Sequence, residues 1–120
     1  MNDTLKRHFM NPRNMGTIKK ATHSGRCKSG FCGDTVEVTA TVDPQSETIT
    51  AVKYKVFGCY AVIAAASIIS EWCLSKTLSE VQELGYDLVS YLIGGEIEPG
   101  KESCIQTAID AFKNLSAVSH

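Results

Sequence analysis

The chain has 120 residues, a formal net charge of −1 and an apolar fraction of 43%, which are ordinary values for one globular domain. They exclude a disordered or fibrous chain, and we predict a single domain over residues 1–120 that binds neither nucleic acid nor membrane. The longest apolar stretch, residues 56–69, is interrupted and is shorter than the roughly 20 residues that span a bilayer. Because the N-terminus lacks the apolar segment of a secretory signal, we predict a cytoplasmic protein.

The charge is distributed unevenly along the chain. Residues 1–60 contain nine Lys/Arg and five Asp/Glu, whereas residues 61–120 contain three and eight. Two arrangements fit this asymmetry. Either the two halves present oppositely charged faces to partners, or their charges mix over an ordinary solvated surface.

The first 33 residues predict little regular structure. Asp3 or Thr4 would cap a helical turn or two that places Leu5, Phe9 and Met10 on one side, and Asn11-Pro12 would end it. The following stretch, residues 17–33, is polar and rich in glycine. It predicts a short edge strand near its beginning and then a loop.

The next segment predicts a hairpin. Residues 35–42 alternate between apolar and polar side chains, and residues 47–57 do so again after a turn. A bulge near Ala51 would bring Ile49 onto the same face as the later apolar residues. We therefore expect two antiparallel strands with one buried face.

The remainder of the chain predicts helices. Apolar spacing predicts a buried helix from Val62 to about Lys76 and a last helix with an apolar stripe over residues 105–115. Between them, Asp87 would cap a short helix that runs through Leu92. Capping boxes would begin helices at Thr77 and Ser103. The fold class is therefore α+β, with a small antiparallel sheet of about three strands packed against several helices.

The five cysteines are the main functional signal. An odd number of cysteines in a reducing compartment favours metal binding or thiol chemistry over disulfides. Cys32, Cys59 and Cys104 each stand where turn residues meet a strand or a helix, so we predict that the fold brings them together into one site. Cys59 and Cys104 would lie at helix N-termini, where a thiolate is stabilised.

Asp34 is the predicted fourth ligand of this site. It lies close to Cys32 in the chain, and three thiolates with one carboxylate oxygen make a tetrahedral set. Cys73 lies on the apolar stripe of its helix and is expected to be a core residue. Cys27 is either a sulfur relay or alternate ligand, or an exposed loop thiol.

Several motifs together resemble the IscU/NifU-type scaffolds for iron-sulfur cluster assembly over nearly the whole chain. The matching motifs are His8-Phe9-Met10-Asn11-Pro12-Arg13-Asn14-Met15-Gly16, Cys32-Gly33-Asp34, Phe57-Gly58-Cys59, Ile63-Ala64, Ala66-Ser67, Glu71-Trp72, Pro99-x-Lys101 and Cys104. The resemblance implies that Cys32, Cys59 and Cys104 hold a nascent [2Fe-2S] cluster and that Asp34 favours its lability. It also implies a cysteine desulfurase that donates sulfur, a supply of iron and acceptor apoproteins. Such a protein is a carrier without catalytic residues, and we expect a monomer or a weak homodimer.

The chain departs from the family pattern at three places. Ser103 stands where these scaffolds usually have a histidine before the third cysteine, and we expect it to act as a helix cap. The chaperone-recognition stretch reads Glu98-Pro99-Gly100-Lys101 instead of two prolines and a valine before the lysine, so a dedicated chaperone is not expected. Tyr60 replaces a small residue, and would either crowd the site or fill the core.

Two other functions remain open. The absence of the histidine resembles the zinc-binding SufU-type sulfurtransferases, in which persulfide would be accepted on Cys104 or Cys59, although their usual insertion between the second and third cysteines is missing. A purely structural zinc domain would need four permanent ligands. His8 and His23 are further ligand candidates, from a mobile loop or from another copy.

Overall fold

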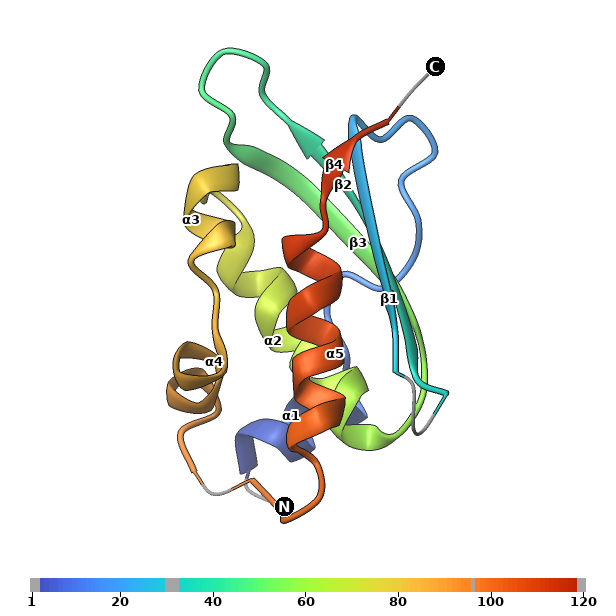
Figure 1. The fold of residues 1–120 in the computed structure, drawn as a ribbon, viewed down its shortest axis with the longest axis vertical. Helices are drawn as coiled ribbons and strands as arrows, with labels where there is room; N and C mark the ends of the chain where they lie inside the picture. The colour runs from blue at the N-terminus through green and yellow to red at the C-terminus, as the bar shows by residue number, and fades with distance from the viewer. Residues whose placement is uncertain (1–2, 30–32, 96, 119–120) are drawn as a thin grey trace.

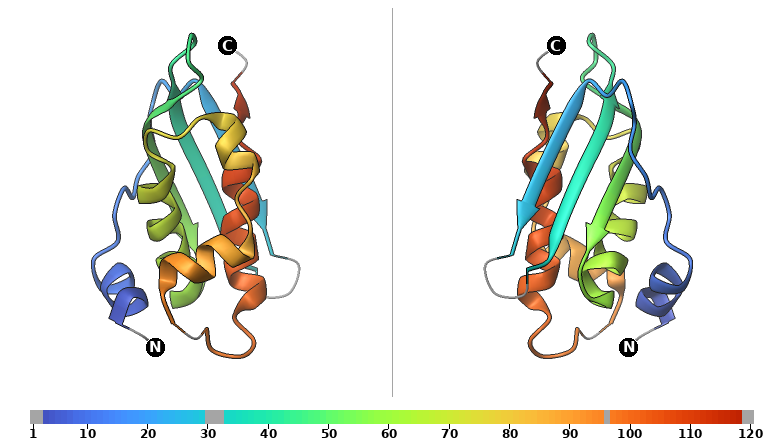
Figure 2. Two further views of the ribbon diagram at one scale, coloured as in Figure 1. Left: turned by 90° about the vertical axis from the view of Figure 1, so that its left-hand side faces the viewer. Right: turned by 90° about the vertical axis from the view of Figure 1, so that its right-hand side faces the viewer.

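The computed structural model describes residues 3–29, 33–95 and 97–118. These residues form an α+β fold in which helices cover one face of an antiparallel sheet (Figures 1 and 2). The elements in chain order are α1 (Asp3–Met10), β1 (His23–Lys28), β2 (Thr35–Val42), β3 (Ile49–Phe57), α2 (Tyr60–Cys73), α3 (Leu78–Gln82), α4 (Tyr86–Ile93), α5 (Glu102–Lys113) and β4 (Ser116–Ala117).

The β2–β3 hairpin is confirmed. Alternate residues of β2 are buried against the helices, because side chains along a strand point to opposite faces in turn. The register shifts between Thr41, which pairs with Ala51, and Val42, which pairs with Ile49. Thr50 is therefore the extra residue of a bulge, and Ile49 is fully buried as expected.

The sheet has four strands in the described residues, in the order β3-β2-β1-β4, so the prediction of about three strands was too low. The prediction also placed the early strand near residue 17, whereas β1 begins at His23. The sequence of β1 has no alternation of apolar side chains, and Gly25 shows one reason for this. A Cβ atom there would collide with the Ala111 carbonyl oxygen and lie 2.8 Å from the Leu115 amide nitrogen, so α5 packs directly on the strand backbone.

Helices α2 and α5 form the centre of the helical layer and run in the same direction, with both N-termini at the lower end of the molecule in Figure 1. Most residues of α2 are buried, and the predicted apolar stripe of α5 is buried along its whole length. Helix α1 packs against α2 through Leu5. The expectation that Met10 would join this contact was wrong, since it is 71% exposed.

One predicted helix cap is confirmed and two are wrong. Thr77 and Glu80 form both hydrogen bonds of a capping box before α3. Helix α4 begins at Tyr86, one residue before the expected cap Asp87. Helix α5 begins at Glu102, because a turn at Gly100 (φ +89°) reverses the chain and the Glu102 carboxylate accepts a hydrogen bond from the Gly100 amide. Ser103 is therefore an exposed residue of the first turn and not a cap.

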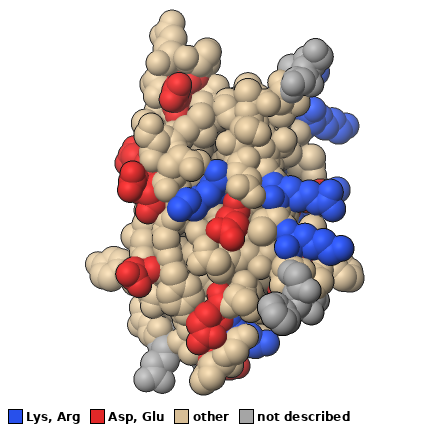
Figure 3. All heavy atoms as spheres, in the orientation of Figure 1, with Lys and Arg blue, Asp and Glu red and all other residues tan. Residues whose placement is uncertain are grey.

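The two signs of charge gather on different sides of the molecule. In the view of Figure 3, basic side chains lie mainly on the side of the sheet and acidic ones mainly on the side of α3 and α4. On the outer face of the sheet, Arg26 pairs with Glu37 at 3.6 Å, while Lys53 and Lys55 are exposed on β3. Whether oppositely charged faces meet partners stays a prediction. None of the described helices is both long and apolar enough to cross a membrane.

Candidate metal centre

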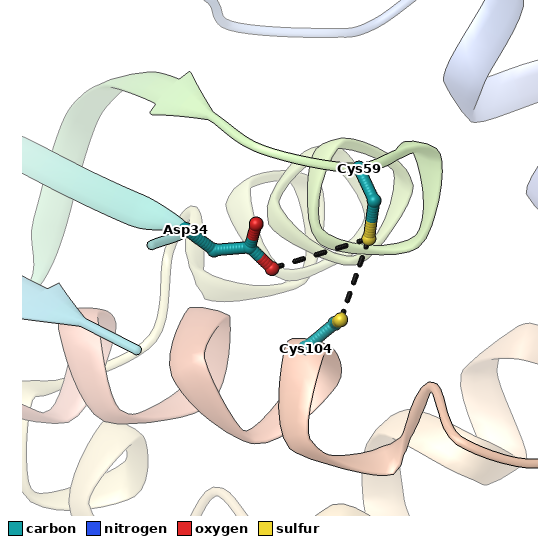
Figure 4. Close-up of side chains that lie close together, drawn as sticks. All are labelled: Asp34, Cys59 and Cys104. Atoms are coloured by element: carbon teal, nitrogen blue, oxygen red, sulfur yellow. Dashed lines mark hydrogen bonds between the residues drawn. The ribbon is translucent and has the colours of Figure 1, made fainter. Parts of the chain in front are cut away.

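Three of the predicted ligands converge at the N-termini of α2 and α5. The Cys59 thiol donates a hydrogen bond to the Cys104 sulfur at 3.4 Å, and the Asp34 Oδ2 atom lies 4.0 Å from the same thiol (Figure 4). One ligand atom from each of the three residues lies within 4.8 Å of the other two. Two soft sulfur donors and one hard oxygen at this spacing suit zinc or an iron-sulfur cluster.

The helix starts determine where the two thiols lie. Cys59 occupies the N-cap position of α2 with an extended backbone (φ −75°, ψ 172°), and its side chain makes no capping bond. Its carbonyl instead accepts the first helical hydrogen bond, from the Ile63 amide at 3.2 Å. Cys104 is the third residue of α5. Both thiols therefore face the positive ends of two helix dipoles, an arrangement that favours bound anions and thiolates.

Asp34 enters the site from the sheet. It immediately precedes β2, and its side chain is almost completely buried, with 3% of the residue exposed. The Asp34 carbonyl accepts a hydrogen bond from the Ser29 amide at 2.7 Å, which brings together two residues that flank Cys32 in the sequence. Cys32 itself lies outside the described residues, so its membership of the site stays a prediction.

Gly58 makes room for the Asp34 carboxylate. A Cβ atom at this position would lie 2.6 Å from Asp34 Oδ1 and 2.7 Å from the Val62 Cγ1 atom. Both distances are shorter than a van der Waals contact, so any larger residue would displace the carboxylate or the first turn of α2. Gly58 was predicted only as part of the Phe57-Gly58-Cys59 motif, although a glycine at the end of a strand often marks a close approach of other parts of the chain.

Gly58→Ala is therefore expected to weaken metal binding by about 1–3 kcal/mol, the usual cost of overpacking. Zinc competition against a chromophoric chelator measures this effect directly. Gly85→Ala is the matched control, because a Cβ atom there meets nothing within 4 Å and the Gly85 backbone is extended. Equal zinc affinities for the two variants would contradict the packing of Asp34 against Gly58.

Burial governs the protonation of Cys104 in the metal-free protein. Burial is the largest cause that raises the pKa of the Cys104 thiol to about 12, followed by its hydrogen bonds with Cys59 and Asp34 and by their negative charges. The helix N-terminus was expected to stabilise the thiolate, whereas the pKa of Cys104 is raised. A metal that binds Cys104 must therefore displace a proton.

Two further described cysteines, Cys73 and Cys27, do not belong to this cluster. Cys73 is fully buried on α2, and burial raises the pKa of its thiol to about 12, which confirms it as a core residue. Cys27 is half-buried on β1 and is not an exposed loop thiol. The pKa of Cys27 is raised, by burial first and then by the charge of Asp110. The role of Cys27 as a sulfur relay stays a prediction.

The other ligand candidates do not reach the cluster. His8 has its Nδ1 atom 2.7 Å from the Ser67 hydroxyl and its Nε2 atom 3.5 Å from the Glu71 carboxylate, so it joins α1 to α2. His23 lies on β1, where its ring contacts the Thr22 hydroxyl. Among the described residues, the only group of metal-ligand side chains is Asp34, Cys59 and Cys104, and Ser103 is exposed beside it.

Comparisons with known proteins agree on the family. The chain matches the family model of the NifU-like N terminal domain over residues 1–119. It is 32% identical to the iron-sulfur cluster assembly scaffold protein IscU of Aquifex aeolicus, covering 92% of this chain and 70% of the relative. It is also 32% identical to the IscU protein of Rickettsia prowazekii, covering 88% of this chain and 81% of the relative.

Solved structures show the same fold at low sequence identity. A protein of Fervidobacterium islandicum AW-1, described as a candidate cluster assembly scaffold of the SUF system, matches with a TM-score of 0.78 at 16% identity, over 94% of this chain and 93% of that one. A NifU-like N-terminal protein of Brucella abortus matches with a TM-score of 0.72 at 14% identity, over 93% and 88%. Since the family model and the relatives above 30% identity cover most of its length, this chain belongs to the family of NifU-like N-terminal domains.

Proposed function

We propose that this protein is a scaffold on which a [2Fe-2S] cluster is assembled and from which the cluster passes to acceptor proteins. The observation that carries the proposal is the convergence of Asp34, Cys59 and Cys104 within 4.8 Å, from three separate parts of the chain. Membership of a family whose relatives include IscU scaffolds supports it. Residues 1–120 act as one domain in this proposal.

The chemistry of the donors suits a cargo that must leave again. Thiolates of Cys59 and Cys104, with Cys32 as the third, would bind iron strongly because sulfur is a soft ligand. The Asp34 oxygen would be the hard and weaker fourth ligand. A cluster with three thiolate ligands and one weak oxygen ligand would be bound firmly enough to assemble and loosely enough to transfer. The protein would therefore act as a carrier and not as an enzyme.

The proposal implies particular partners. A cysteine desulfurase supplies sulfur as persulfide, and apoproteins that need a cluster accept the product. Both steps require reduced thiols, so we place the protein in the cytoplasm, where disulfides are rare. The N-termini of α2 and α5 lie together at one end of the molecule, and we expect partners to approach there (Figure 1).

A zinc-bound sulfurtransferase is the second candidate function. The similarity in fold to the SUF-system protein of Fervidobacterium supports it, and the three described ligands also suit zinc. In that reaction a thiolate of Cys104 or Cys59 would attack the outer sulfur of the donor's persulfide. The persulfide would then reside on this chain, and the donor cysteine would leave as a thiolate.

Anaerobic reconstitution distinguishes the two functions. Incubation with a cysteine desulfurase, cysteine and ferrous iron is expected to yield about two irons and two sulfides per cluster, with visible charge-transfer bands. Zinc in a purified sample would not distinguish the two functions, because zinc would bind to the same thiolates as iron. If iron and sulfide do not bind and only a persulfide forms, the scaffold proposal is wrong and the sulfurtransferase is supported.

A further inference from the structure

Tyr60 is held by contacts from two other parts of the chain. Its ring meets the ring of Phe9 on α1 edge-on, with centroids 6.1 Å apart and planes at 74°. The Lys101 ammonium lies 5.3 Å from the centroid of the Tyr60 ring, within cation–π range. A hydrogen bond from the Tyr60 hydroxyl to the Glu98 carboxylate is the largest cause that raises the Tyr60 pKa to about 12.

These contacts lie directly beside the thiol pair. Tyr60 follows Cys59 and is the first residue of α2, while Lys101 is the N-cap residue of α5, one turn before Cys104. The Tyr60–Lys101 contact therefore joins the same two helix N-termini as the 3.4 Å contact between the Cys59 and Cys104 sulfur atoms. Two side-chain links thus span one short gap between α2 and α5.

We propose that Tyr60 is a positioning residue that clamps the start of α5 to the start of α2 and so limits the opening of the Cys59–Cys104 pair. Its significance for cluster assembly rests on the proposed function, because this pair would hold the cargo. The clamp itself is a property of the metal-free protein. Tyr60 does not merely fill the core, because it is only half-buried. Its ring faces the Lys101 ammonium and its hydroxyl faces the Glu98 carboxylate.

Alkylation of individual cysteines in the metal-free chain tests the clamp. Iodoacetamide labelling followed by peptide mass spectrometry gives a separate rate for each thiol. Tyr60→Ala is expected to speed the alkylation of Cys104 by about two- to fivefold, the ratio that corresponds to ~0.5–1 kcal/mol for an exposed cation–π contact. Tyr60→Phe retains the ring and is expected to restore the slow rate to within about twofold.

The same sample contains its own controls. Cys73 is fully buried on α2, so its alkylation reports global unfolding, and Cys27 on β1 reports loosening of the sheet. Both rates are expected to stay unchanged in Tyr60→Ala. Lys76→Met is the matched variant, because the Lys76 ammonium lies 5.6 Å from the Trp72 ring centroid, a cation–π contact at the opposite end of α2.

A double-mutant cycle shows whether the two residues act together. Lys101→Met alone is expected to speed Cys104 alkylation as Tyr60→Ala does. When both substitutions are combined, the alkylation rate of Cys104 is expected to equal that of Tyr60→Ala alone. Lys76→Met is expected to leave Cys104 unchanged. The clamp is refuted by an unchanged Cys104 rate in Tyr60→Ala, by an equal rise at Cys73, or by additive effects of the two substitutions. No iron or sulfide is present, so these results are independent of whether the scaffold proposal holds.

Discussion

Replacing Cys59 or Cys104 with serine is expected to abolish stable cluster binding in the reconstitution assay, with iron and sulfide falling to background. A serine oxygen is a hard and weakly acidic ligand that does not substitute for a thiolate on iron. The two sulfur atoms lie 3.4 Å apart, so removing either one leaves a single described thiol beside Asp34. Cys32→Ser is expected to have the same effect, which would also test the one ligand outside the described residues.

Cys73→Ser is the control for these variants. Cys73 is fully buried and lies on the core side of α2, away from the site. Its serine variant is expected to bind a cluster normally but to lose about 1–3 kcal/mol of unfolding free energy, because it buries a hydroxyl. Chemical denaturation and iron analysis together separate the two effects. Equal cluster binding by all four serine variants would exclude a shared thiolate site.

Asp34→Ala is expected to lengthen the lifetime of the bound cluster and to slow its transfer to an acceptor. The carboxylate is buried and lies 4.0 Å from the Cys59 sulfur, where its oxygen would be the one hard ligand beside the thiolates and the weakest bond to the cluster. Because cluster release would begin at this weakly bound oxygen, removing the oxygen is expected to slow transfer. Transfer kinetics, followed by the change in visible absorption after an apo-acceptor is added, measure the effect.

Three further variants show which property of Asp34 matters. Asp34→Asn keeps the volume and removes the charge, so it is expected to behave like Asp34→Ala. Asp34→Cys completes a set of four thiolates and is expected to hold the cluster longest. Ser103→Ala is the control, since Ser103 is exposed and caps no helix, and its effect on stability is expected to stay within about 0.5 kcal/mol. Unchanged transfer in Asp34→Ala, or cluster loss in Ser103→Ala, would show that the fourth ligand is a different residue.

The start of α5 was predicted incorrectly, and this changes the role assigned to Ser103. The sequence pattern predicts that Ser103 begins the helix, which would give its hydroxyl a structural task. The helix begins one residue earlier, at Glu102, whose carboxylate turns back to the Gly100 amide. The hydroxyl of Ser103 is thereby left at the surface, one residue from Cys104.

Helices and strands with local signals could be predicted from the sequence. The alternation of residues 35–42 predicts β2, the Thr77–Glu80 capping box predicts the start of α3, and the apolar spacing of α5 predicts its buried face. Each of these signals spans one strand or a few helical turns, so it can be recognised without knowing what packs against it. The motifs around the cysteines also sufficed to indicate the family.

The meeting of Cys59 and Cys104, and the residues around them, depend on contacts between distant parts of the chain. Cys59 and Cys104 are 45 positions apart, and no local pattern encodes the 3.4 Å between their sulfur atoms or the ring of Tyr60 beneath the Lys101 ammonium. Gly25 and Gly58 carry no periodic signal because their role is the absence of a side chain where other parts of the chain pack. The protonation of Cys104 depends on burial, which arises only when α2, α5 and the sheet close around it.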